Sequence, residues 1–292
     1  KVNIKGYINN QYPNAKTNFD ETLRKIREQY KKPVFSFEVG QFEVLPDFDE
    51  LAHFKGISDP ANYRRIQRMV REKGLEPVWK KYVEATGELS RLCYREEIEA
   101  AMRTKDLSGI SLLGLQDFPG QGTALVGMLD SHLEPKPFDF AKPEKFRAFF
   151  KEQLVLVGLE KYTYVQIANY GKTDCAGDLE WTLWAYMPNE ELDSVRKVAV
   201  KSGHMSAVSC PKGTLSKVGT LKIELNNKIT APVRCDLTVK IADAVNSYPI
   251  WIYKSELPKC PESVYETTKL DLQAKKVLDN GGIVYYSPKS EE

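Results

Sequence analysis

The sequence contains few cysteines and histidines, and it spaces them widely. The cysteines show none of the short spacings typical of metal sites, and their odd number excludes a fully paired disulfide scaffold. The histidines lie too far apart to share one face of a single helix. The sequence therefore predicts no metal ion and no cofactor. The residues concerned are Cys93, Cys175, Cys210, Cys235, Cys260, His53, His132 and His204.

Long apolar runs and a strong charge bias are also absent. No apolar run approaches the roughly 18 residues of a membrane helix, and the opening residues, KVNIK, lack the apolar core of a signal peptide. A net charge of +2 indicates neither a nucleic-acid nor a membrane partner. With 292 residues, 42% of them hydrophobic, the chain is expected to be globular with about two domains.

Residues 33–41 form a short apolar run, PVFSFEVGQ, with one carboxylate near its end. This length and this β-branched and aromatic content are typical of a strand buried on both faces in a parallel sheet. An acid at the carboxyl end of such a strand is where a β/α barrel keeps its chemistry. Glu38 is therefore a candidate catalytic residue. The alternative is a strand-end acid that pairs with a nearby Lys or Arg.

Residues 109–122, GISLLGLQDFPGQG, repeat this layout of an apolar strand followed by polar residues and a Gly/Pro-rich loop. The region between the two strands is helical, with no room for a third strand. A strand, a helical layer and a parallel strand make a βαβ unit. Glu38 and Asp117 are thus expected at the same edge of a sheet.

Together, residues 37–41 (FEVGQ) and 115–127 (LQDFPGQGTALVG) resemble the last two strands of the catalytic barrel in glycoside hydrolase family 2. The resemblance is strongest to the β-galactosidase and β-glucuronidase-like members from Bacteroidetes. Residues 251–253 (WIY), after a run of β pattern, resemble the end of the sandwich domain that follows this barrel.

The resemblance implies a fold class of α/β plus all-β. Residues 1–153 would be the C-terminal part of a (β/α)8 TIM barrel, and residues 154–255 an antiparallel immunoglobulin-like β-sandwich. Residues 256–292 would begin a truncated α/β domain or form a linker. Because a complete barrel takes about 250 residues, the chain is expected to be a piece of a larger enzyme. The resemblance also implies a periplasmic or secreted parent protein.

The resemblance further implies retaining hydrolysis of a β-linked sugar, of the β-galactoside or β-glucuronide type. In that chemistry one carboxylate attacks the anomeric carbon and a second carboxyl group donates a proton. Glu38 matches the nucleophile, whereas the family's acid/base residue would precede Lys1. The isolated chain is accordingly expected to show no turnover.

Four further residues match the rim of the family's site, and they are expected to hydrogen-bond sugar hydroxyls or to orient Glu38. They are Gln41, Gln116, Asp117 and Gln121. Stabilisation of their own loops is the alternative. Glu43 is a weaker candidate, and the other acids of its loop, Asp47, Asp49 and Glu50, are interpreted as solvated charges. Many family members carry an aromatic residue where this sequence has LQDF, which leaves the sugar open.

Helices are predicted over residues 18–30, from Asp59 as cap to Gly74, and over 76–85, 88–103 and 143–151. The helix over 88–103 is expected to bury one set of residues and expose another. The buried set is Leu89, Leu92, Cys93 and Ile98, and the exposed set is Arg95, Glu96, Glu97 and Glu99.

From residue 154 the period changes to two, and strands are predicted over residues 154–158, 161–169, 179–186, 221–226, 234–242 and 249–253. Trp181 and Trp184 are expected in the sandwich core, with a sugar-binding face as the alternative. Residues 264–267, 270–278 and 283–286 are predicted as strand, helix and strand, with Gly281 and Gly282 ending the helix.

Two functional hypotheses follow. In the first, the chain holds the nucleophile half of a glycosidase site, and its partner is a carbohydrate substrate. In the second, it is a non-catalytic structural or carbohydrate-contacting module. The sequence makes no prediction of oligomeric state.

Overall fold

The structure is a computed structural model that describes residues 18–57, 59–120, 125–159, 163–189, 194–225, 232–253 and 259–288. The chain divides into two compact units, one that holds the helical part and the β-sheets that follow, and one formed by the C-terminal segment. Among the described residues, no helix combines the length and the apolar character needed to cross a membrane.

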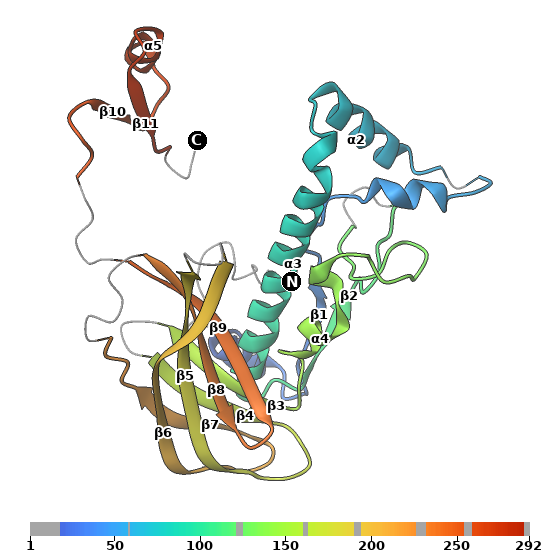
Figure 1. The fold of residues 1–292 in the computed structure, drawn as a ribbon. Helices are drawn as coiled ribbons and strands as arrows, with labels where there is room; N and C mark the ends of the chain where they lie inside the picture. Colours follow the sequence, from blue (N-terminus) through green and yellow to red (C-terminus); the bar gives the residue numbers. More distant parts are fainter. Residues whose placement is uncertain are drawn as a thin grey trace. The chain divides into compact units, whose positions relative to one another are not determined.

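The first half of the chain is organised around two parallel strands, β1 (Phe35–Gly40) and β2 (Gly109–Leu113). The intervening segment supplies a 3-10 turn η1 (Phe48–Ala52), helix α2 (Ala61–Glu72), a turn η2 (Glu76–Val78) and the long helix α3 (Trp79–Met102). Helix α1 (Asp20–Gln29) precedes β1, while η3 (Asp139–Ala141) and α4 (Pro143–Arg147) follow β2. The predicted strand–helix–parallel strand arrangement is confirmed (Figure 1).

Burial of the strand pair is one-sided within the described residues. Ile110 and Leu112 of β2 pack against the core cluster that includes Ile98 of α3. Phe35 and Phe37 of β1, in contrast, are 62% and 75% exposed. The prediction of a strand buried on both faces is therefore wrong for β1 as the structure describes it. These two strands do not show a barrel.

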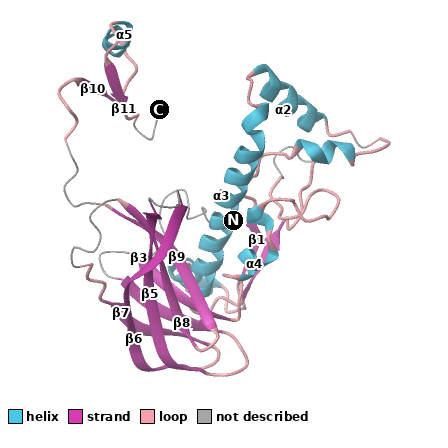
Figure 2. Cartoon of the chain, in the orientation of Figure 1, coloured by secondary structure: helices cyan, strands magenta, loops and turns pink. Residues whose placement is uncertain are grey.

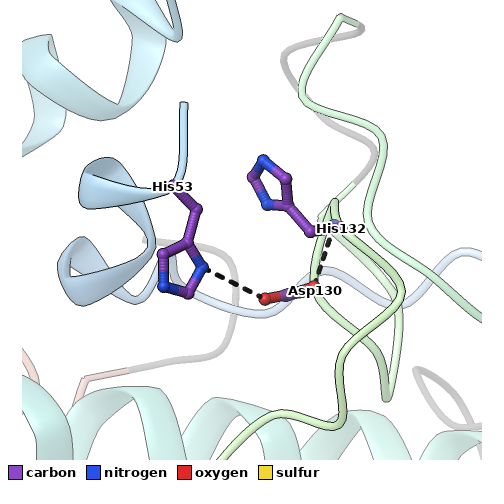
Figure 3. A group of neighbouring side chains, drawn as sticks. All are labelled: His53, Asp130 and His132. Carbon is purple, nitrogen blue, oxygen red and sulfur yellow. Dashed lines mark hydrogen bonds and ion pairs between the residues drawn. The ribbon is translucent and has the colours of Figure 1, made fainter. Parts of the chain in front are cut away.

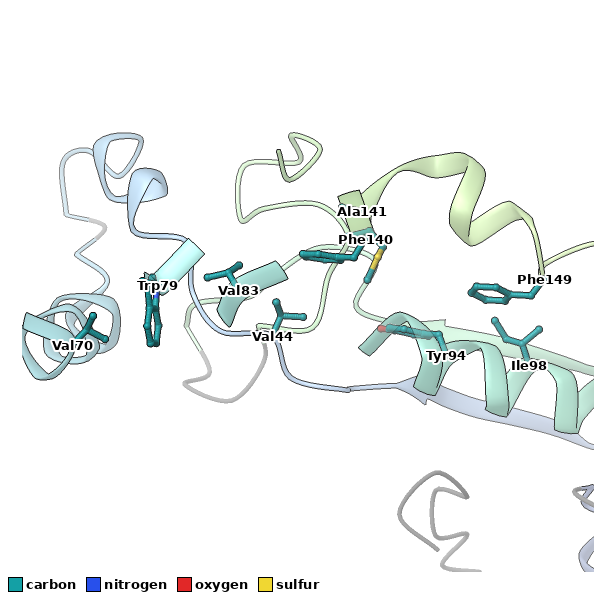
Figure 4. Packing of buried hydrophobic residues seen from close by; sticks show 10 residues of the cluster. Val44, Val70, Trp79, Val83, Tyr94, Ile98, Phe140, Ala141 and Phe149 are labelled. Atoms are coloured by element: carbon teal, nitrogen blue, oxygen red, sulfur yellow. The ribbon is translucent and has the colours of Figure 1, made fainter. Parts of the chain in front are cut away.

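The core of this half joins α2, α3 and the segments after each strand (Figure 4). Its buried members are Val44, Val70, Trp79, Val83, Tyr94, Ile98, Met128, Phe140, Ala141 and Phe149. The side chain of Trp79 stacks on Phe48 with ring centroids 5.2 Å apart, and its Nε1 donates to the Pro46 carbonyl at 2.9 Å. This packing holds η1 against the start of α3.

Three helix predictions need correction. Helix α2 begins at Ala61 without a side-chain cap, because the Asp59 carboxylate instead accepts from Nε of Arg64 at 2.6 Å. The expected break in the next helix is absent, and α3 runs continuously through Gly87. A Cβ on Gly87 would lie 2.1 Å from the Phe140 ring, so the glycine serves close packing rather than termination. Helix α4 is shorter than predicted.

Helix α3 also buries charged residues that were expected outside. Glu96 and Glu99 are buried, and Arg95 is largely so, whereas Leu89 is 57% exposed. The cause is that α3 is covered on a second side by strands β3 (Gln153–Leu159) and β9 (Ala244–Ile252). Glu99 accepts hydrogen bonds from Tyr248 and Asn246 on β9.

The second half is an antiparallel β-sandwich, seen as the group of magenta strands in Figure 2. One sheet has the order β3 (Gln153–Leu159), β4 (Thr163–Asn169), β7 (Thr214–Leu221). The other has the order β6 (Ser194–Cys210), β5 (Cys175–Asn189), β8 (Val233–Ile241), β9 (Ala244–Ile252). Residues 154–158 of β3 are all buried, because the sandwich interior covers one face and α3 the other.

The sandwich itself is confirmed, but several of its strands differ from prediction. Strands β5 and β9 begin before the predicted strands over residues 179–186 and 249–253. The 17-residue strand β6 was not predicted, and β7 ends at Leu221, where the predicted strand over 221–226 would begin. Residue 226 lies outside the described part of the chain. All five cysteines are free, in agreement with the prediction that they do not form a disulfide scaffold.

The C-terminal unit contains a parallel pair, β10 (Val264–Thr267) and β11 (Ile283–Tyr286), connected by α5 (Leu272–Asp279). Asp271 caps α5 by accepting from the Ala274 N–H at 2.8 Å. Gly281 has φ +74°, and the Gly282 N–H donates to the Val277 carbonyl, which ends the helix as predicted.

Candidate functional site

Glu38 lies in an irregularity of strand β1. Ser36 pairs with Ile110 and Val39 with Leu112, so Phe37 and Glu38 together stand opposite Ser111. This is a β-bulge, a feature that often re-aims a side chain next to an active site. The side chain of Glu38 is exposed. No ion pair joins it to a described Lys or Arg, so the alternative of a simple strand-end pair finds no support there.

The end of β1 has an unusual backbone. Glu38 has φ +58°, Gly40 φ +111° and Gln41 φ +68°. A non-glycine residue held in the left-handed region costs on the order of 1–3 kcal/mol, and such residues cluster at functional sites. A Cβ on Gly40 would also lie 2.4 Å from the Tyr94 ring, so this position requires glycine twice over.

Tyr94 of α3 ties together the ends of both strands. Its ring packs against Gly40, and its hydroxyl donates to the Val126 carbonyl at 3.2 Å and lies 3.5 Å from the Gly114 carbonyl. Burial raises the pKa of this hydroxyl to about 12, so it stays a donor. The carboxyl ends of β1 and β2 are thus held side by side.

A cavity of about 430 Å³ lies beside β1 and brings Glu38 together with a second carboxyl group, Glu97 of α3. The remaining lining is mainly apolar and includes Phe35 and Phe37. Glu97 accepts from the Gly40 N–H at 3.3 Å. Burial raises the pKa of Glu97, and the Gly40 hydrogen bond only partly offsets this. Glu38 and Glu97 therefore line the same cavity, and burial raises the pKa of Glu97 above its ordinary value.

The other predicted site residues are placed as follows. Gln41 and Gln116 are exposed, Gln116 next to a short backbone bridge with Leu129. Asp117 is 2% exposed, and its carboxylate accepts from Lys136 Nζ at 2.8 Å and from the Gly127 N–H at 2.8 Å. Gln121 lies outside the described residues. The Asp117 carboxylate is therefore buried and bonded to residues that follow it in the chain.

Glu50 has an environment that the sequence did not reveal. It was predicted to be a solvated loop charge, and it is instead 5% exposed. Its carboxylate accepts from the Tyr63 hydroxyl at 3.1 Å and from the Ser131 N–H at 2.9 Å. Burial, followed by the Glu50 charge, raises the pKa of Tyr63. Glu50 therefore connects η1 and α2 with the loop that follows β2.

Next to Glu50, three potential metal ligands converge (Figure 3). His53 comes from the end of η1, and Asp130 and His132 come from a turn after β2. One donor atom of each lies within 4.8 Å of the others. The spacing of the histidines in sequence concealed this, because the prediction considered only sites on one helix.

In the sandwich, Trp181 is 7% exposed, which confirms its prediction as a core residue. Trp184 lies on the opposite face of β5, half-buried, with Lys197 Nζ 5.3 Å from its ring centroid. The neighbouring ring of Tyr186 is approached by Lys197 and by Arg234 at 5.6 and 4.9 Å. A role of Trp184 in sugar binding stays a prediction.

Comparisons with known proteins give distant likenesses. A family described as a domain of unknown function (DUF8488) matches residues 162–254, which include most of the sandwich. No curated protein matches the chain.

Among solved structures, the exo-chitosanase CsxA of Amycolatopsis orientalis is 13% identical, with a TM-score of 0.40 over 59% of this chain and 19% of its own. The β-D-mannosidase of Dictyoglomus thermophilum is 14% identical, with a TM-score of 0.40 over 58% and 19%. Red sea bream transglutaminase is 12% identical, with a TM-score of 0.29 over 46% and 22%. The chain spans about a fifth of the length of each of these structures. Likenesses this distant assign neither a fold nor a function to the chain.

Proposed function

We propose that this chain supplies the nucleophile part of a retaining glycoside hydrolase site for β-linked sugars, of the β-galactoside or β-glucuronide type. The observation that carries the proposal is the backbone of Glu38. Glu38 lies in a β-bulge with a backbone φ of +58°, and its side chain is exposed. The bulge is close to the carboxyl end of β1, which pairs in parallel with β2. The sequence resemblance to glycoside hydrolase family 2 around this residue supplies the reaction class and a periplasmic or secreted setting.

The chemistry requires Glu38 to be ionised when it attacks. Its carboxylate forms a bond to the anomeric carbon while the glycosidic C–O bond breaks, and the leaving oxygen takes a proton from a second carboxyl group. Water then cleaves the glycosyl–Glu38 ester, with the second group acting as base. Retaining enzymes hold the two carboxyl groups about 5–5.5 Å apart.

The proton donor has two candidates. If the resemblance to glycoside hydrolase family 2 holds for the donor, that residue would lie upstream of Lys1. Within the described residues, Glu97 is the carboxyl group that lines the same cavity as Glu38, and its raised pKa suits a proton donor. The experiment below distinguishes the two.

The remaining predicted residues take supporting roles. Gln41 and Gln116, both exposed near the strand ends, would hydrogen-bond sugar hydroxyls. The buried Asp117–Lys136 pair would fix the loop that carries Gln116. Gln121 is proposed as a further sugar contact on the sequence resemblance alone.

The test is covalent trapping with 2-fluoro glycosides of the galactosyl, glucuronyl and glucosyl series. The proteins are the chain itself and a longer polypeptide that contains it. We expect mass spectrometry of the longer polypeptide to locate the sugar on the peptide that contains Glu38. The Glu38→Gln variant should remain unlabelled, and the neighbouring Glu43→Gln should label normally.

The variants also identify the donor. If Glu97 donates the proton, Glu97→Gln slows turnover of poorly activated substrates far more than that of activated aryl glycosides. If the donor lies elsewhere, Glu97→Gln leaves this ratio unchanged. Absence of a label on every sugar, under conditions that fully trap a known retaining enzyme, would refute the proposal.

The alternative is a non-catalytic module that contacts carbohydrate. One observation favours it, namely the outward-facing aromatic and cationic group of Trp184, Tyr186, Lys197 and Arg234 on the sandwich. Loss of oligosaccharide binding in Trp184→Ala, together with failure to trap any sugar, would support this reading.

A further inference from the structure

We infer that His53, Asp130 and His132 form a binding site for one divalent transition-metal ion, with zinc as the best fit. The inference does not depend on the proposed glycosidase activity, because none of the three residues belongs to the strand ends that carry Glu38 and Gln41. It rests on how the donor atoms converge, on what holds them, and on their chemical type.

The donor atoms are close enough that rotation of the side chains could bring all three within bonding distance of one metal ion. They lie within 4.8 Å of one another, and His53 Nδ1 is 4.0 Å from Asp130 Oδ2. Zinc bonds of about 2.0–2.2 Å in a tetrahedron place the donors roughly 3.3 Å apart. The His53 side chain is 56% exposed and can rotate to make up this difference.

Asp130 is oriented by its own turn. Its Oδ1 accepts from the backbone N–H groups of His132 and Glu134 at 2.8 and 2.9 Å. The turn is closed by a bond from the Asp130 N–H to the Glu134 carbonyl at 2.8 Å. Because these bonds occupy Oδ1, Oδ2 is the oxygen directed toward His53, as Figure 3 shows.

His132 is held by a buried carboxylate. Its Nδ1 lies 3.5 Å from Oε1 of Glu50, which is itself fixed by Tyr63 and by the Ser131 N–H. Metal-bound imidazoles usually have such a carboxylate partner, which sets the ring orientation and raises its basicity. The ring of Phe54 packs edge-on against His132 with centroids 4.8 Å apart, which limits its movement further.

The donor set selects the class of metal. Two imidazoles and one carboxylate suit zinc and its first-row neighbours, whereas magnesium and calcium prefer oxygen ligands alone. The charges of Asp130 and the adjacent Glu50 favour a cation. Three protein ligands leave one coordination position open for water or another small ligand. Since His53 and His132 come from separate segments, the ion would also tie η1 to the loop after β2.

The experiment is calorimetric titration of zinc into the chain, with Cys260→Ser as the background because Cys260 is the exposed thiol among the five. We expect one ion per chain, at least tenfold weaker binding in His53→Ala and in His132→Ala, and unchanged binding in His204→Ala. His204→Ala is the matched control, because it also removes one imidazole, from a residue on β6 that is distant in sequence from the site.

Two further measurements test whether the ion binds at His53. Cobalt added to the same protein should give the strong visible absorption of a four-coordinate ion, and this band should be lost in His53→Ala. Zinc should raise the melting temperature of the parent protein but not that of His53→Ala. His53 is at the surface, so this variant is expected to fold even if His132→Ala does not.

Equal zinc affinity in His53→Ala and His204→Ala would overturn the inference, because binding would then be adventitious. No zinc binding to the folded parent would overturn it as well. Preferential binding of magnesium or calcium would refute the transition-metal assignment.

Discussion

Glu96 provides the sharpest test of the energetics, because it is a buried carboxyl group without a hydrogen-bond partner. It lies on α3 and is 2% exposed, and neither of its oxygens has a partner among the described residues. Burial raises the pKa of Glu96 to about 7, against a smaller opposing effect of Arg103. The ionised form is therefore tolerated poorly in the folded protein.

The direction in which stability changes with pH follows from the number of protons that the folded and unfolded chains bind. Between pH 4.5 and 7 the folded chain holds a proton on Glu96 that the unfolded chain has released, so stability falls as pH rises through this window. Each tenfold change in proton affinity is worth about 1.4 kcal/mol. A pKa near 7 in place of 4.5 then lowers the free energy of unfolding by about 3 kcal/mol at pH 8.

The perturbation is Glu96→Gln, which keeps the shape and removes the charge. At pH 8 we expect the variant to be more stable than the parent by about 3 kcal/mol, and at pH 5 by less than about 1 kcal/mol. Urea unfolding followed by circular dichroism at several pH values measures both. The exposed Glu72→Gln on α2 is the control and should follow the parent at every pH.

Glu99 does not obscure this measurement. Its two arginine partners lower its pKa despite complete burial, so its contribution is lost only as pH falls below the usual carboxyl range. That window lies below the one in which Glu96 titrates. If Glu96→Gln showed the same stability difference from the parent at pH 5 and pH 8, the assignment of an unsolvated, ionisable Glu96 would be refuted.

Three further substitutions test the packing. Lys136→Met leaves the buried Asp117 charge unpaired and should cost about 3–5 kcal/mol in urea unfolding, most of which the added Asp117→Asn should restore. Tyr248→Phe removes a 2.8 Å hydrogen bond to the buried Glu99 carboxylate, and we expect a loss of about 1.5–3 kcal/mol, whereas a loss below 0.5 kcal/mol would contradict this. Gly87→Ala raises helix propensity but should lower the melting temperature, because the new methyl group would overlap the Phe140 ring. A higher melting temperature would show that the Phe140 ring can move aside.

The sequence was informative where an element is covered on one side only. Helix α1 shows a regular apolar stripe, and the pattern of strand, helix and strand in the C-terminal unit is followed closely by β10, α5 and β11. The parallel pairing of β1 and β2 also follows from the chain between them, since parallel strands need a long crossover. In these cases the local pattern and the tertiary environment agree.

The sequence misled where an element is covered twice. Charged residues on α3 were assigned to solvent because a helix normally has one polar face. Glu99 is instead enclosed by Arg95 on its own helix, by Arg103 at the C-cap of that helix and by Tyr248 from β9. Nothing in the spacing of residues 95–103 reveals a partner that lies 149 positions away in sequence.

The candidate site also contains features that the sequence predicts and features that it does not. Glu38 could be proposed from the apolar run and the acid near its end, but the bulge and the left-handed backbone that present it could not. The group of His53, Asp130 and His132 depends on the meeting of two loops from different parts of the chain. Local patterns locate strand ends, whereas loop–loop contacts depend on the whole core.

The position of α3 between the strand pair and the sandwich has a consequence for synthesis on the ribosome. The helix is completed at Met102, yet Asn246 and Tyr248, which donate hydrogen bonds to the buried Glu99 carboxylate, emerge only when nearly the whole sandwich has been made. Until then the acidic face of α3 is open to water, and the helical part cannot lock into its final packing. Nascent chains arrested before β9 should therefore remain sensitive to protease in α3, and resistance should appear in a single step once β9 has left the exit tunnel.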